Sequence, residues 1–330
     1  MSSPAIAERG ELPPKSRNTP RLRTVLVAIA LFVMYLFFLA RAVTEAGRRS
    51  VSLEIPPKDA DYLFVDISVV QVDLLRSEMT TRISFQLAGQ MAQDAVTPAA
   101  DLHLLLNTVR GQQEFDFAKG QRINPIEAVF PLHGNVNFYP FDDHKGTLWF
   151  FLTIPERENV SSTPDTVPEQ IAQLPGLTVG TFSLKKRTLA DMKAAFTASI
   201  PGLTFRASKS AESVKGLTGI EVNLRRETNV ILISIAIMLM MAGLAVGLVT
   251  MVLKIISGRR RADAFHITMS VSLIFGLPAL RNVQPSIPPI GTLGDAVAFT
   301  WAELAAAGSA IALIVDWLLR SRSDNTPPAK

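Results

Sequence analysis

Four long apolar segments constrain this 330-residue chain more than any other feature of its sequence. A helix needs about 20 residues to cross the ~30 Å hydrocarbon core of a bilayer, and roughly 17 is the lower limit. Two of the segments exceed this length and the other two are just long enough. The sequence therefore predicts four transmembrane helices, at residues 24–43, 229–253, 264–281 and 295–319.

Basic residues beside these helices predict the orientation, because Lys and Arg are retained on the cytoplasmic side. They precede the first helix, separate the second from the third, and follow the fourth: Lys15, Arg17, Arg21, Arg23, Lys254, Arg259, Arg260, Arg261, Arg320 and Arg322. We therefore expect a multi-pass plasma-membrane protein with cytoplasmic tails at 1–23 and 320–330 and a cytoplasmic loop at 254–263. Residues 44–228 and 282–294 would lie outside. The net charge of +4 then reflects topology, and no nucleic-acid partner is expected.

The first apolar segment has an alternative interpretation as the core of a signal peptide. Ala40-Arg41-Ala42 follows it and fits a small-x-small cleavage site. The long basic stretch before it and its length favour an uncleaved anchor. The chain contains no cysteine, so its exported part has no disulfides.

Short alternating apolar runs in the outer segment predict β-strands. Within 81–87, for example, Ile83, Phe85 and Leu87 alternate with polar residues. The runs, separated by Gly, Pro, Asn and Asp, are 62–74, 81–87, 102–109, 126–130, 147–154, 177–184, 203–207 and 219–224. They predict an all-β extracytoplasmic sandwich of about eight antiparallel strands, with a flap at 160–176.

The corner FYPFDDH, residues 138–144, raises the question of a metal or acid–base site. Asp142, Asp143 and His144 could ligate a divalent ion, but three consecutive side chains point in different directions. The favoured interpretation is structural: Pro140 holds Tyr139 extended, and an aspartate bonds a backbone N–H in the turn. We expect no metal and no other cofactor. The chain also lacks GxSxG, HExxH and P-loop motifs, so we expect no catalytic residues and no enzymatic activity.

Ionisable residues are rare within the predicted helices. Glu303 lies about two turns inside the outer end of the last helix, where an unpaired carboxylate costs on the order of several kcal/mol. It is expected to be protonated, to face a wet cavity or to pair with a cation, for which Arg281 is the nearest candidate. Asp316 lies one turn before Arg320 and is expected to form an interfacial anchor.

Small residues within the helices predict close packing. In lipid, packing rather than the hydrophobic effect drives helix association, so such residues favour contacts between helices or with a second subunit. The residues at three- and four-residue spacing are Gly243 and Gly247 with Ala242 and Ala245 in the second helix, and Ala305, Ala306, Ala307, Gly308 and Ser309 in the last.

Two stretches carry a resemblance to a known family. FYPFDDH and FGLPALRNVQPSIPPIGTLGDAVAFTWAE, with the order of one anchor, one outer domain and three further helices, resemble an uncharacterised integral-membrane family known mainly from actinobacteria. This family, domain of unknown function 4436, covers residues 24–320. The resemblance implies no mechanism.

A more distant resemblance is to the pentameric ligand-gated ion channels. YPFD is similar to their aromatic-Pro-Phe-Asp loop, NLRRET to the stretch before their first span, and HITMSVSL to their pore helix. This resemblance implies a coupling corner at the membrane surface, formed by Tyr139, Pro140, Phe141, Asp142, Arg225 and Arg226. It also implies hydroxyls at Thr268 and Ser272 on one helix face. Alternatively, these hydroxyls bond backbone carbonyls. The residues themselves, not the resemblance, add His266, Arg281 and Glu303 as intramembrane polar positions, and Arg281 departs from the channel pattern because it interrupts the outer half of the pore helix.

The sequence thus predicts a non-enzymatic cell-envelope protein. Its outer sandwich would bind a ligand, a lipid or a partner protein, and the helices would anchor or transmit that event. Membrane lipid and either a protein partner or a second copy of the chain are the expected partners. The alternative function is that of a subunit in an oligomeric pore.

Overall fold

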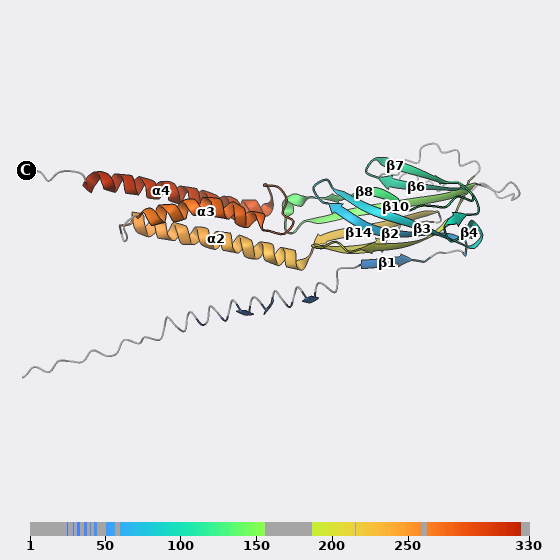
Figure 1. The fold of residues 1–330 in the computed structure, drawn as a ribbon, viewed down its shortest axis with the longest axis horizontal. Coiled ribbons are helices and arrows are strands. Elements are labelled where there is room, and N and C mark those ends of the chain that lie inside the picture. Colours follow the sequence, from blue (N-terminus) through green and yellow to red (C-terminus); the bar gives the residue numbers. More distant parts are fainter. Residues whose placement is uncertain are drawn as a thin grey trace, which may run out of the picture. The chain divides into compact units, whose positions relative to one another are not determined.

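Alternating apolar residues between 51 and 226 form two β-sheets, seen in a computed structural model (Figure 1). The residues described are 51–56, 60–155, 187–214, 216–258 and 263–324, with scattered positions between 25 and 44. The first sheet contains, in order, β1 (Val51–Ile55), β12 (Asp191–Ala198), β2 (Tyr62–Asp73), β3 (Glu78–Ala88) and β8 (Ile126–Pro131).

The second sheet is built around the long strand β10 (Asp143–Pro155). Its order is β13 (Leu203–Lys209), β14 (Leu217–Arg226), β10, β6 (Leu102–Thr108) and β7 (Gly111–Phe117), with β9 (His133–Gly134) and β11 (Arg187–Leu189) also pairing with β10. A small hairpin joins β4 (Ala92–Asp94) to β5 (Thr97–Pro98), and single 3₁₀ turns occur at η1 (Gly89–Met91) and η2 (Val136–Phe138).

The inner faces of the two sheets share one hydrophobic core. Leu63, Val65 and Ile67 of β2 and the predicted Ile83, Phe85 and Leu87 of β3 are buried in it. The second sheet contributes Leu104, Leu106, Leu148, Phe150, Leu152, Ile220, Val222 and Leu224 from alternate positions. The sandwich-like architecture predicted from the alternation is therefore confirmed.

The details of the strands differ from the prediction. The structure has additional strands, and β12 pairs with β2 in parallel rather than antiparallel fashion. β12 lies between β1 and β2, and its parallel pairing with β2 is possible because a long stretch of chain separates the two strands. The predicted strand at 177–184 and the predicted flap at 160–176 lie outside the described residues.

Three described helices are long and apolar enough to cross a membrane. They are α2 (Thr228–Ile256), α3 (Ala264–Asn282) and α4 (Thr300–Asp324), and a π-helical turn, η4 (Asp295–Phe299), leads into α4. Most of the first predicted span, 24–43, lies outside the described residues.

Helices α2, α3 and α4 run alongside one another (Figure 1) and share a second apolar core. This core contains Met241, Ala245 and Leu248 of α2, Leu277 of α3, and Ala302, Ala306 and Leu313 of α4. The predicted packing glycines are not part of it. Gly243, Gly247 and Gly308 are exposed, and a Cβ built on any of them meets no atom within 4 Å. Ala245 and Ala306, which were predicted together with the glycines, are buried between the helices and provide the close approach within this chain.

Candidate functional site

The aromatic-proline corner lies between β9 and β10 and directs its side chains alternately. After η2, where the Asn135 side chain accepts a hydrogen bond from the backbone N–H of Asn137 at 3.0 Å, the chain turns through a cis Tyr139–Pro140 peptide bond. Tyr139 is fully buried, whereas Phe138 and Phe141 are 55% and 58% exposed. The corner therefore presents Tyr139 to the protein and two phenyl rings to the surroundings.

Tyr139 connects the sandwich to the helices. Its hydroxyl lies 2.7 Å from Oγ of Ser234 on α2 and donates to the backbone carbonyl of Pro285, in the loop after α3, at 2.9 Å. Ser234 Oγ in turn donates to the carbonyl of Val230 one helical turn earlier. Burial raises the pKa of the Tyr139 hydroxyl above its ordinary value, so this group stays neutral and donates.

Asp142 and Arg226 form a buried ion pair at the same place. Nε of Arg226, the last residue of β14, donates to both carboxylate oxygens of Asp142, at 3.0 and 3.1 Å. Both residues are at least nine-tenths buried. The predicted contact between Asp142 and one of the two arginines is thus present for Arg226, while Arg225 is exposed and lies 3.9 Å from Asp143.

His144 completes the carboxylate's environment. Its Nε2 lies 3.1 Å from Oδ2 of Asp142, and its buried Nδ1 has no hydrogen-bond partner in the described part of the chain. Burial alone would raise the pKa of Asp142, but the hydrogen bonds from His144 and Arg226 outweigh burial and lower it. Asp142 therefore remains charged.

The Arg226 guanidinium also reaches the loop between α3 and α4. Its Nη1 donates to the carbonyl of Ser286 at 3.2 Å, and its Cζ lies 5.1 Å from the centre of the Tyr139 ring. A small cavity of about 290 Å³ adjoins this arginine, between the turn after β2, the turn before β13 and the same loop. One side chain at the end of β14 thus contacts the corner and the helix loop together.

A second turn of the sandwich contacts the start of α2. The backbone N–H of Glu227 donates to the carbonyl of Gly202 at 3.0 Å, and Gly202 returns a hydrogen bond to Oε2 of Glu227 at 3.2 Å. Gly202 has a φ of 81°, which favours glycine. This contact was not predicted. The Pro201-Gly202 turn signal was visible in the sequence, but its partner was not.

A separate clamp closes the loop between α3 and α4. Arg281 donates from Nε and Nη2 to the two oxygens of Asp295, at 2.6 and 2.8 Å, and from Nη2 to the carbonyl of Pro288. Asp295 also accepts from the backbone of Gly291 and from Thr292. The predicted pairing of Arg281 with Glu303 is therefore wrong, because Asp295 is closer along the loop and better placed for a two-point contact.

The remaining predicted polar positions have local roles. His266 accepts from the backbone N–H of Asp263 in a capping box at the start of α3. Thr268 and Ser272 donate to the carbonyls of Ala264 and Thr268, the alternative that the sequence left open.

Two further carboxylates lie on α4. Glu303 is partly buried, and its Oε2 has no hydrogen-bond partner among the described residues. Asp316 accepts from Arg320 at 2.9 Å, as expected of the anchor pair. Among the described residues no three His, Asp or Glu side chains are placed to hold a metal ion.

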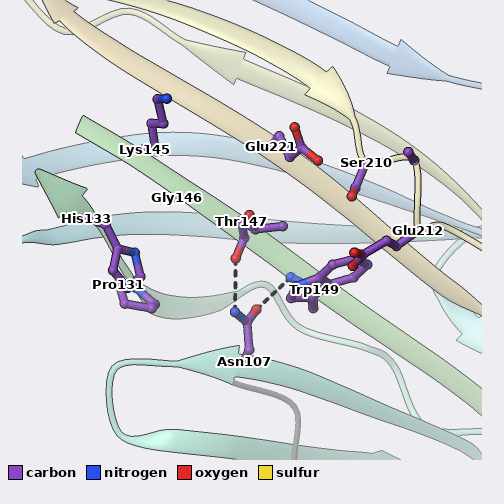
Figure 2. A pocket seen from close by; sticks show the side chains of 11 residues that line it. Asn107, Pro131, His133, Lys145, Gly146, Thr147, Trp149, Ser210, Glu212 and Glu221 are labelled. Carbon is purple, nitrogen blue, oxygen red and sulfur yellow. Dashed lines mark hydrogen bonds between the residues drawn. The ribbon is translucent and has the colours of Figure 1, made fainter. Parts of the chain in front are cut away.

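A second feature is a pocket of about 620 Å³ on the outer face of the second sheet (Figure 2). β10 pairs with β9 only at His144 and Lys145 and with β6 only from Phe150 to Thr153, which leaves a gap between the two partners. In this gap the Asn107 side chain makes the hydrogen bonds that the backbone of a neighbouring strand would otherwise make. Its Nδ2 donates to the Thr147 carbonyl at 3.0 Å, and its Oδ1 accepts from the Trp149 N–H at 2.6 Å. The gap in the sheet is thus stabilised without a strand.

Family models divide the chain at the junction just described. The model described as Domain of unknown function (DUF4436) matches residues 54–224, just over half of the chain. The chain belongs to this family. A second model, Domain of unknown function (DUF8686), matches residues 226–320. No curated protein matches the chain. In this DUF4436 protein the boundary between the two matched regions falls beside Arg226.

Proposed function

We propose that this DUF4436 protein is a non-enzymatic receptor or accessory subunit of the cell envelope. Its sandwich lies outside the plasma membrane and binds a ligand, a lipid or a partner protein. Four transmembrane helices, the first of them an anchor at 24–43, hold it with both termini in the cytoplasm. The observation that carries this proposal is the junction, in which Arg226 contacts Asp142, Tyr139 and Ser286 together.

The junction supports coupling between the sandwich and the helices because its contacts are buried and specific, and because it lies where the chain passes from β14 into α2. Arg226 ends β14, which lies between β13 and β10 in the second sheet, and α2 begins two residues later at Thr228. Asp142 holds the buried Arg226 side chain in place within the sandwich, and the Arg226 guanidinium and the Tyr139 hydroxyl bond Ser286, Ser234 and Pro285 of the helical part, so the sandwich and the helices are expected to move together. A binding event that shifts β10 or β14 would thereby reach α2.

Lipid is part of the proposal because of the exposed apolar side chains around the junction. Phe138 and Phe141 of the corner are joined by Val283 and Ile290 of the helix loop, which are 71% and 72% exposed. Val283 and Ile290 lie in the loop after α3, and Phe138 and Phe141 flank Tyr139, whose hydroxyl contacts Pro285 in that loop. A bilayer interface is expected at this end of the helices. They would rest among lipid headgroups and hold the sandwich at a fixed height.

Transmission through the junction can be measured in the full chain, because the native sequence has no cysteine to interfere with labelling. Spin labels on Ser257→Cys and Leu319→Cys report the separation of the cytoplasmic ends of α2 and α4, and both positions are exposed. The Asp142→Asn substitution should change the distribution of distances between the two labels in lipid nanodiscs. Arg225→Gln, which alters an exposed neighbour, is the matched control and should not. An unchanged distribution with Asp142→Asn would reject transmission.

A pore subunit is the second candidate function. The outward positions of Thr268 and Ser272 favour it, because these hydroxyls lie on an exposed face of α3. The exposed Gly243, Gly247 and Gly308 would then contact a second copy. Native mass spectrometry together with ion flux from proteoliposomes distinguishes the two functions. A ring-forming oligomer that conducts supports the pore, and a silent monomer or hetero-complex supports the receptor.

A further inference from the structure

Charged groups of opposite sign line the pocket on the outer face of the second sheet. Lys145 and His133 are directly opposite in the β9–β10 pair, so their side chains share one face. Glu221 lies opposite Thr147 on β14, and Glu212 lies in the loop that follows β13. Figure 2 shows His133 and Lys145 toward one end of the pocket, Glu212 toward the other, and Glu221 between them.

These charges are available for a ligand. In the part of the chain that the structure describes, Lys145, Glu212 and Glu221 form no ion pair. Lys145 and Glu221 are diagonal neighbours across the β10–β14 pair, and such positions are about 7–8 Å apart at Cα. A molecule between them can therefore contact both without moving the strands.

The pocket also has a rigid apolar wall. Trp149 is only 4% exposed, and its ring occupies the space that a Cβ on Gly219, its cross-strand partner, would take. Asn107 fixes the backbone on either side of Leu148, because its two polar groups bond the Thr147 carbonyl and the Trp149 N–H. A preformed wall lowers the ordering cost of binding.

We propose that this pocket binds a small zwitterionic molecule of about dipeptide size. Its carboxylate contacts Lys145 and His133, its ammonium group contacts Glu221 and Glu212, and its apolar part lies beside Trp149. The volume of about 620 Å³ falls within the range of small-molecule sites, and a dipeptide carries one charge of each sign at its two ends, which suits a pocket with Lys145 toward one end and Glu212 toward the other (Figure 2). This inference rests on the proposed function, because it names the ligand class of the outer sandwich.

Three matched probes test the two charged ends separately by calorimetric titration of the full chain in nanodiscs. They are alanyl-alanine, its N-acetyl form, which lacks the cation, and its C-terminal amide, which lacks the anion. Alanyl-alanine should bind, and each blocked form should bind about tenfold more weakly, the factor expected from one charge-assisted hydrogen bond.

Substitutions in the protein should match the change in the probe. Lys145→Gln should weaken the binding of alanyl-alanine about tenfold but should not weaken the binding of the C-terminal amide further. Glu221→Gln should also weaken the binding of alanyl-alanine about tenfold but should not weaken the binding of the N-acetyl form further. Arg206→Gln, on the exposed face of the neighbouring strand β13 and outside the pocket, is the control and should leave all three affinities unchanged.

Three results would overturn the assignment: no binding of any probe at millimolar concentration, equal binding of all three, or losses in the variants that add to those of the blocked probes. The label-distance measurement is made without ligand and is therefore independent. If Asp142→Asn changes that distribution but no dipeptide binds, only the ligand class is rejected. If dipeptides bind but the distribution is unchanged, only transmission is rejected.

Discussion

Arg226 and Asp142 remain charged at the junction although they are buried. Removing a guanidinium and a carboxylate from water is unfavourable, and only close, well-oriented contacts compensate for it. Here Arg226 Nε contacts both oxygens of Asp142, and Nη1 contacts the Ser286 carbonyl. The pair is therefore a specific contact: it stabilises one arrangement of the corner against the end of β14 and disfavours others in which either charge would stand alone.

The lowered pKa of Asp142 predicts how stability depends on pH. Because the folded pKa lies below the unfolded value of about 3.9, Asp142 contributes stability that is fully present above that value and is lost as the pH falls through the folded pKa. The free energy of unfolding, followed between pH 6 and pH 2, should fall less steeply for Asp142→Asn than for the unmodified chain. Equal slopes would show that Asp142 is not stabilised as a charge.

Tyr139→Phe should destabilise the full chain by about 1–3 kcal/mol, because it removes a buried hydroxyl and leaves the part-buried Pro285 carbonyl without its donor. Ser234→Ala should cost less, since the Tyr139 hydroxyl keeps the carbonyl contact. Denaturant titration of both variants, with Phe141→Leu on the exposed side of the corner as control, measures the difference. A Tyr139→Phe variant as stable as the control would contradict the proposed role of the hydroxyl.

Sequence reasoning found one half of the junction and missed the other. Asp142 and the two arginines could be named because the corner and the stretch before α2 have recognisable patterns. Ser234, Ser286 and Gly202 could not, because serine and glycine are common and their contacts depend on where distant loops return. Asp295 was overlooked because a carboxylate at a helix start is ordinarily a cap.

Among the elements, the strands predicted most reliably were those with large apolar residues at every second position. β2 and β3 are of this kind, and their alternate residues lie in the core. β12 has the sequence DMKAAFTA and β7 has GQQEFDF, in which small or polar residues weaken the alternation. The parallel β12–β2 pairing could not be predicted, because register between distant strands leaves no local signal.

In the helices, enlarging the exposed glycines and enlarging a buried alanine should have opposite effects on stability. Replacing Gly243 and Gly247 by Ala should leave stability unchanged or raise it by up to about 1 kcal/mol per site, because the added methyl meets no atom and alanine favours the helix. Ala306→Leu should cost about 1–3 kcal/mol, because Ala306 is fully buried between helices. Unfolding in mixed micelles compares the variants, and a larger cost for the glycine pair would place an interface there.

For the whole molecule, the proposed topology places the pocket and the end of α2 on opposite sides of the membrane. In intact cells, a membrane-impermeant maleimide should label Glu212→Cys and should not label Ser257→Cys, whereas both should react after permeabilisation. Both positions are exposed, so burial does not limit the reaction. Labelling of Ser257→Cys in intact cells would contradict the proposed topology, because it would place the end of α2 outside the membrane.

A double-mutant cycle tests most directly whether the Asp142–Arg226 pair organises the junction, because Asp142 holds the arginine whose Nη1 contacts the Ser286 carbonyl in the loop between α3 and α4. Asp142→Asn and Arg226→Gln should each destabilise the full chain in nanodiscs by about 3–5 kcal/mol, because each leaves one buried charge unpaired. The double variant should be more stable than the sum of the two losses implies, with a coupling energy of about 1–3 kcal/mol. Losses that add to within about 0.5 kcal/mol would mean that the two side chains do not interact, and the proposed coupling would be wrong.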